Sequence, residues 1–147
     1  MKKEYGRERR YSKDFPNRND IVKWDVLKIN KEQTLKVNLI SKNSSRDQGV
    51  RVAVDVGKGC IECWGKQGRD LHIWWGDPPR EIVFKVDSSE GFVSVFNMFR
   101  RDDGTYQFHA YHGGMIIEEK DNKFIYHCND YGETDIFDKL VFSVEKL

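Results

Sequence analysis

Two cysteines of this 147-residue chain stand at the spacing used by zinc knuckles, in Cys60-Ile61-Glu62-Cys63. In a knuckle the backbone turns between the two thiolates, so both can reach one metal ion. On a regular strand the same two side chains point to opposite faces and cannot converge. The sequence has no second pair at knuckle spacing. We therefore expect no zinc site and predict that the cysteines pack as small apolar residues.

Three histidines, His109, His112 and His127, are candidates for general acid–base chemistry, and with Cys128 they are the other possible partners of a metal. If this region lined a cavity, the chain could be an enzyme acting on a small ligand. The sequence lacks a nucleophile elbow, a Gly-rich phosphate loop and an H-E-x-x-H motif. We expect a protein that is not an enzyme, and the histidine-lined cavity is the alternative.

Three tryptophans, Trp64, Trp74 and Trp75, gather in the middle of the chain. Side chains alternate along a strand, so the adjacent Trp74 and Trp75 should lie on opposite sides of a sheet. An exposed indole offers a large, rigid contact area to a sugar ring or to a protein. We take these three residues, with Tyr131, as candidate ligand-binding residues; the alternative is that the rings cover the core.

An acidic segment, residues 129–138, precedes the last apolar stretch. Carboxylate and amide oxygens are the hard ligands that calcium prefers, although the segment does not match the EF-hand pattern. Calcium is therefore a possible cofactor. Its candidate ligands are Asn129, Asp130, Glu133, Asp135 and Asp138. The alternative is a solvated loop whose charge is balanced by neighbouring lysines.

The run from Asp135 through Phe137-Asp138 to Leu140-Val141-Phe142 resembles the closing element of calcium-binding β-sandwich modules, including jelly-roll carbohydrate-binding modules. The resemblance covers only the C-terminal end of the chain. It implies a fold of two sheets, a structural calcium on the acidic turn, and a sugar or protein ligand on one face or at the loops.

Strands must position these residues, because apolar side chains recur with a period of two from Asp20 onward. In residues 50–56, valines at alternate positions share one face, as in a half-buried strand. Further strands are predicted over residues 21–29, 34–41, 60–65, 71–75, 81–87, 92–100, 105–112, 115–120, 123–128 and 140–146. Many short strands separated by Gly and Asp turns predict an all-β fold, either an antiparallel jelly-roll-like β-sandwich or a closed barrel.

Residues 92–128 carry three turn signals, Asp102-Asp103-Gly104, Gly113-Gly114 and Asp121-Asn122. They predict an antiparallel meander in which strands that are consecutive in sequence are neighbours in space. Residues 1–19 interleave basic and acidic side chains without apolar periodicity, which predicts a disordered polar tail before one β domain over residues 20–147.

The formal net charge of +1 gives no global field, so we expect neither nucleic acid nor a membrane as a partner. The sequence has no apolar run typical of a signal peptide, and three cysteines fit a reducing compartment. A cytoplasmic location is expected, or a secreted one if a signal peptide has been removed. The oligomeric state stays open.

We expect a non-catalytic β-sandwich module that binds a protein or a carbohydrate through exposed aromatic residues. An intracellular immunity-type or regulatory protein is the alternative. Such a protein would bind a basic partner through the acidic face of residues 118–138.

Overall fold

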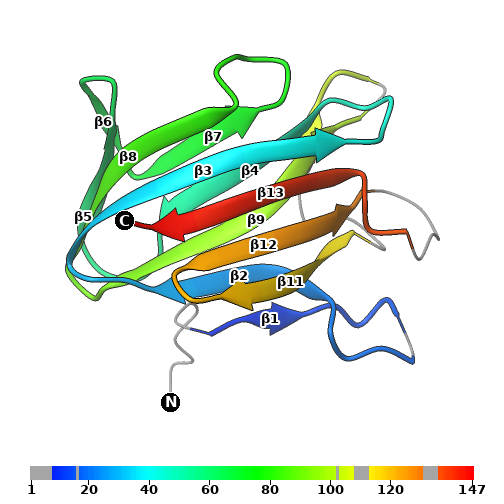
Figure 1. The fold of residues 1–147 in the computed structure, drawn as a ribbon, viewed down its shortest axis with the longest axis horizontal. Coiled ribbons are helices and arrows are strands. Elements are labelled where there is room, and N and C mark those ends of the chain that lie inside the picture. Colours follow the sequence, from blue (N-terminus) through cyan, green and yellow to red (C-terminus); the bar gives the residue numbers. More distant parts are fainter. Residues whose placement is uncertain (1–7, 16, 102, 108–112, 131–135) are drawn as a thin grey trace.

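The computed structural model describes residues 8–15, 17–101, 103–107, 113–130 and 136–147. In these ranges the regular secondary structure consists of β-strands and includes no helix, which confirms the predicted all-β fold (Figure 1). The strands are β1 (Arg10–Tyr11), β2 (Val22–Lys28), β3 (Glu32–Lys42), β4 (Gln48–Val54), β5 (Gly59–Cys63), β6 (Lys66–Gly68), β7 (Asp70–Trp74), β8 (Glu81–Ser88), β9 (Phe92–Arg100), β10 (Tyr106–Gln107), β11 (Gly114–Lys120), β12 (Lys123–Asn129) and β13 (Leu140–Lys146).

The strands form one antiparallel sheet that closes almost completely into a flattened barrel, in the order β6-β5-β8-β3-β13-β12-β11-β2-β9-β4-β7. At one seam β2 pairs with β11 at Val22 and then with β9 over residues 25–28. At the other seam the chain passes from β6, which pairs with β5, through Arg69 into β7, which pairs with β4. Two layers result, and Figure 1 shows β3, β13 and β12 crossing in front of β4 and β9.

The core lies between the two layers. In β8, Ile82, Phe84 and Val86 point inward and alternate with exposed residues. The same cluster includes Val50 and Val52 of β4, from the other layer. Burying a side chain of this kind stabilises the fold by roughly 1.5–3 kcal/mol. The interior is therefore committed to packing, and the outer faces are where side chains can meet a ligand.

Residues 92–128 do not form the continuous meander that the turn signals predicted. β9 and β10 pair as one hairpin and β11 and β12 as another, the second through the predicted turn at Asp121-Asn122. However, β2 lies between β9 and β11 in the sheet. Gly114 belongs to β11, and a Cβ at this position would lie 2.5 Å from a methyl carbon of Ile21. Gly114 thus allows the chain to pack closely at β2, a non-local contact that local turn residues do not encode.

Part of the segment predicted as a disordered tail, β1 and Phe15, contacts the barrel. β1 pairs with the first half of β2. Phe15 is buried, and its ring centroid lies 5.6 Å from that of Phe137. A single phenylalanine among charged residues gives no periodic signal, which is why the sequence pattern did not show this contact.

Candidate functional site

Trp64 is the most exposed of the predicted ligand-binding residues. It stands in the turn between β5 and β6, with 69% of its surface exposed and a backbone φ of +52°. Bulky residues rarely adopt this left-handed conformation, which favours Gly or Asn. Tyr131, the fourth predicted aromatic residue, lies outside the described residues.

Trp74 and Trp75 are covered by other side chains. Trp74 is buried on the outer face of β7, where Gly49 leaves room for its ring and the Arg100 guanidinium lies 4.3 Å from the ring centroid. Trp75 is half-buried against the core, and the Arg80 guanidinium lies 3.9 Å from its ring centroid. Both rings therefore contribute mainly to packing.

The three cysteines have different environments. Cys63 faces the core, and burial raises the pKa of its thiol. Cys60, three residues earlier on β5, lines a groove on the outer surface. Cys128 is fully buried, which raises its pKa well above the ordinary value. Cys60 and Cys63 thus take the opposite orientations expected of a strand, and the expected lack of zinc stays a prediction.

His127 lies on β12 and forms a hydrogen bond with Glu118 of the adjacent β11. It lines neither of the two grooves described below. His109 and His112 lie outside the described residues, so the predicted histidine-lined cavity also lies outside them.

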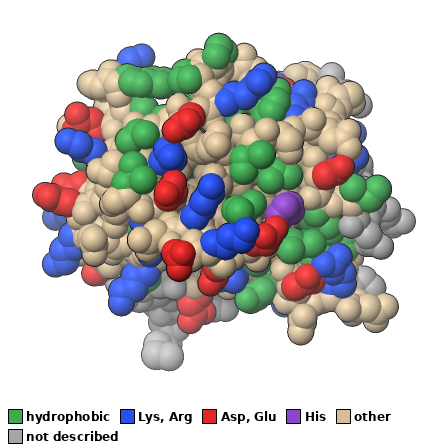
Figure 2. Space-filling view, viewed as in Figure 1, with side chains coloured by type: hydrophobic (Ala, Val, Ile, Leu, Met, Phe, Trp, Pro, Cys, Tyr) green, Lys and Arg blue, Asp and Glu red, His purple; other side chains and the backbone are tan. Residues whose placement is uncertain are grey.

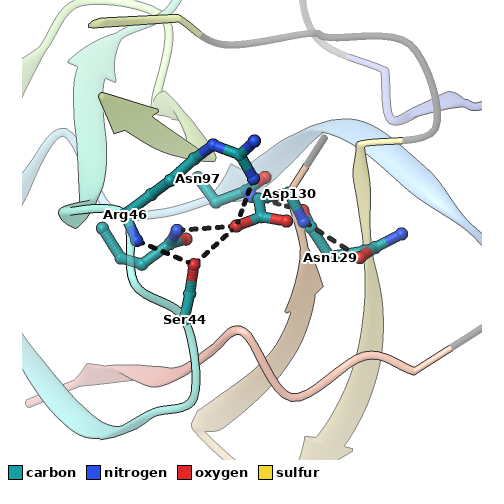
Figure 3. A network of polar contacts seen from close by, with 6 residues as sticks. Ser44, Arg46, Asn97, Asn129 and Asp130 are labelled. Carbon is teal, nitrogen blue, oxygen red and sulfur yellow. Dashed lines mark hydrogen bonds and ion pairs between the residues drawn. The ribbon is translucent and has the colours of Figure 1, made fainter. Parts of the chain in front are cut away.

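Two predicted calcium ligands, Asn129 and Asp130, are buried at the end of β12 (Figure 3). The Asp130 carboxylate accepts hydrogen bonds from Ser44 Oγ at 2.8 Å and from Gln48 Nε2 at 3.0 Å. Asn97 Nδ2 donates to the Asn129 carbonyl at 3.0 Å. These bonds connect β9 and the segment after β3 to the end of β12, which gives both residues a structural role.

Of the other three predicted calcium ligands, only one lies in the described part of the chain. Asp138 accepts a hydrogen bond from Asn43 Nδ2 at 2.7 Å, whereas Glu133 and Asp135 lie outside the described residues. Among the residues that the structure describes, no group of three or more His, Cys, Asp and Glu side chains could hold a metal ion. Calcium binding stays a prediction.

A groove with an aromatic wall lies on the outer face of β2, β9, β4 and β7. Its floor contains Ala53 and Ser94, which are direct cross-strand partners on β4 and β9. Both side chains are small, whereas the flanking positions carry Trp24 on one side and Arg51 and Asp70 on the other. The hollow that results has a volume of about 510 Å³. We call it the Trp24 groove.

The two walls of the Trp24 groove differ in chemistry. The half-buried Trp24 packs on Phe96, with ring centroids 4.9 Å apart. Across the floor, Arg51 Nε lies 3.1 Å from Asp70 Oδ2, and the Arg51 guanidinium carbon is 5.3 Å from the Phe96 ring centroid. The groove thus combines a flat aromatic surface with an ion pair that can both donate and accept hydrogen bonds.

A buried charge fixes the direction in which Trp24 points. Asp25, the next residue on β2, is fully buried and accepts hydrogen bonds from Arg9 Nε and from the Tyr126 hydroxyl, both at 2.7 Å. Burial raises the pKa of Tyr126 well above its ordinary value, and the Asp25 carboxylate raises it further. Because side chains alternate along a strand, an inward Asp25 places Trp24 on the outer face.

Trp24 was not predicted as a ligand-binding residue, because its neighbours suggest the opposite orientation. Alternation would place Trp24 and Val26 inside and the charged Asp25 outside. The partners that make Asp25 stable inside come from residues 9 and 126, which no local pattern connects. The small Ala53–Ser94 pair likewise appears only when the register of β4 and β9 is known.

A second groove, of about 500 Å³, lies over β3, β5 and β8. Glu32, Glu62 and Asp87 outnumber Lys85 along it, and it has no aromatic lining residue. Acidic side chains on an open surface are ordinarily solvated, so we consider the Trp24 groove the better candidate site.

No family model, curated protein or solved structure matches the chain. The candidate site therefore rests on its own geometry. In the described ranges, no helix is long and apolar enough to cross a membrane.

Proposed function

We propose that the chain is a non-catalytic binding module whose Trp24 groove takes a carbohydrate. The observation that carries this proposal is an indole facing an Arg51–Asp70 ion pair across a floor of small side chains. A sugar ring has an apolar C–H face and a rim of hydroxyl groups. The C–H face can stack on an aromatic ring, and the hydroxyls can donate to a carboxylate and accept from a guanidinium.

The scaffold also suits this function. Ligand sites of this kind commonly have volumes of about 300–1,000 Å³, a range that includes the Trp24 groove. Ala53 and Ser94, at 4% and 1% exposure, lie on paired strands and so form a rigid floor. A rigid floor reduces the ordering cost of binding, which matters for a ligand that makes few contacts.

Binding of the chain to an array of neutral and acidic oligosaccharides tests the proposal. We expect wild type to bind at least one glycan. Trp24→Ala removes the stacking surface, and Ala53→Leu fills the groove from its floor while leaving the indole in place. Trp24→Ala should lose roughly twofold to tenfold in affinity from stacking alone, because stacking contributes on the order of 0.5–1.5 kcal/mol beyond the area that it buries. Ala53→Leu should lose at least as much, because its side chain occupies the space of the ligand.

Ala53→Ser, which keeps the floor small, and Trp64→Ala, which lies outside the groove, are the controls and should bind as wild type does. Melting curves of each variant separate lost binding from lost folding. If no glycan binds, or if Ala53→Leu binds as tightly as wild type, the carbohydrate proposal is wrong.

A protein partner that contacts Trp64 is the second candidate function. The 69% exposure of this indole and its left-handed backbone favour a protein partner. A bulky residue in this backbone conformation destabilises the turn, which is a cost that is typical of functional positions. Tryptophans are frequent hot spots of protein interfaces. Loss of binding in Trp64→Ala, with Trp24→Ala unaffected, would favour this function.

The acidic stretch gives less support to an immunity-type protein with a basic partner. Glu118 bonds to His127, Glu119 to Arg9 and Asp138 to Asn43, and Asp130 is buried. Figure 2 shows acidic and basic side chains interspersed on the face formed by β3, β13 and β12. A mixed surface attracts a basic partner weakly, since opposite charges cancel at distances beyond the Debye length.

A further inference from the structure

We infer that the ligand of the Trp24 groove is an acidic saccharide, one whose carboxylate, sulfate or phosphate group is bound by Arg69. This inference rests on the proposed function and names the class of sugar. Three arginines and two aspartates line the groove, an excess of one positive charge. The groove over β3, β5 and β8 has an excess of acidic side chains instead.

The charges of the groove are not equally available to a ligand. Arg51 is neutralised by Asp70, with Nε and Oδ2 3.1 Å apart, and His72 Nε2 also lies 3.1 Å from the same oxygen. Arg10 and Asp55 also line the groove, and each of them interacts with another group of the chain; Asp55 is only 9% exposed. The Arg51–Asp70 pair can therefore form hydrogen bonds with neutral hydroxyl groups, but it contributes little net charge to the groove.

Arg69 is different. It is exposed on the link between β6 and β7, and within the described chain its guanidinium makes no ion pair. Its Nη2 donates to the backbone carbonyl of Asp55 at 3.1 Å, and that carbonyl carries no net charge. A guanidinium has five N–H donors, so most of them remain for a ligand.

The backbone of Arg69 is held in place. The Val54 N–H donates to the Arg69 carbonyl at 3.0 Å, and β6 and β7 pair with β5 and β4 on either side. The held backbone and the hydrogen bond to Asp55 place this charged guanidinium at the margin of an aromatic groove. A guanidinium binds a carboxylate or a phosphate-type group through two parallel hydrogen bonds, and such charge-assisted bonds are roughly twice as strong as neutral ones.

Isothermal titration with matched oligosaccharides tests this inference. The probes are an acidic glycan selected on the array and its neutral counterpart, for example an oligogalacturonate and its methyl ester. Wild type should bind the acidic form at least about tenfold more tightly, as expected for a hydrogen bond to a charged group. Arg69→Gln should remove this preference, because it should lower affinity for the acidic form much more than affinity for the neutral form.

Lys66→Gln is the matched control, because it removes one positive charge from exposed β6 outside the groove lining. It should change either affinity by less than about twofold, as expected for an exposed charge that salt screens. If the neutral glycan binds as tightly as the acidic one, and Trp24→Ala abolishes both, the acidic class is wrong while the proposed function stands. If no glycan of either kind binds, both proposals fail. Equal losses in Arg69→Gln and Lys66→Gln would also overturn the role of Arg69.

Discussion

Asp25 determines more of the candidate site than any residue that lines it. A carboxylate at 0% exposure is stable only when it is paired and hydrogen-bonded, and Arg9 and Tyr126 supply both conditions. Tyr126 is itself stacked on Phe142, with ring centroids 4.6 Å apart, so the position of its hydroxyl is fixed by core packing. The inward Asp25 then places Trp24 outside. A polar cluster in the interior thus orients an aromatic residue on the surface.

The Tyr126 hydroxyl makes stability depend on pH in the alkaline range. Burial, followed by the Asp25 carboxylate, raises the pKa of Tyr126 well above 10.0. The unfolded chain therefore loses this proton near pH 10 while the folded chain keeps it. Stability from this group is present below pH 10 and falls above it, by up to about 1.4 kcal/mol per pH unit. In urea unfolding between pH 9 and 11.5, Tyr126→Phe should show a slope smaller by that amount.

The same variant should lose about 1–3 kcal/mol at pH 7, because Asp25 loses one hydrogen-bond donor. An alkaline slope equal to that of wild type would show that Tyr126 ionises freely in the folded protein, contrary to its environment in the structure.

At the scale of elements, the segment that leads into β1 acts as a strap over the seam between β2 and β11. These two strands pair at a single position, Met115↔Val22, and then diverge. Arg9 spans the region beyond: its Nε contacts Asp25 of β2, and its Nη2 contacts Glu119 of β11 at 3.0 Å. The hydrogen bond and charge of Asp25 raise the pKa of Arg9 despite the opposing effect of burial. Arg9 therefore keeps its positive charge.

Arg9→Ala should destabilise the protein by roughly 3–5 kcal/mol, since removing one partner leaves the Asp25 charge buried without a cation. The measurement is chemical denaturation at pH 7. Lys13→Ala, a change at an exposed residue of the same segment, is the control and should stay within about 0.5 kcal/mol of wild type. A loss below about 1 kcal/mol for Arg9→Ala would show that the strap contributes little.

Strands with clear alternation could be predicted from the sequence, as β4 and β8 show. Alternate Val50, Val52 and Val54 are buried in β4 as expected. The short β1 and β6 could not be predicted, because a stretch of two or three polar residues has no periodicity. The predicted strand order was wrong where pairing is non-local, because β2 lies between β9 and β11. The candidate site could not be predicted for the same reason, since its floor and walls come from strands far apart in sequence.

At the scale of the whole molecule, closure of the sheet creates the candidate site. The barrel has few free edges, because β2 and the β6–β7 segment each pair with both layers. The core cluster fills the interior between the described strands, which leaves their outer faces for recognition. The β7–β4–β9–β2 face joins a strand from each seam, and this places Asp70 and Trp24 on opposite sides of one groove.

The most direct test of this account is a ¹H–¹⁵N spectrum of the full chain during titration with an acidic oligosaccharide selected on the array. The four tryptophans give four indole N–H resonances, each assigned by a single Trp→Phe variant. The Trp24 indole resonance should shift progressively and saturate, while that of Trp64, which lies outside the groove lining, should stay in place. A saturating shift of the Trp64 resonance with Trp24 unchanged would contradict the proposed site.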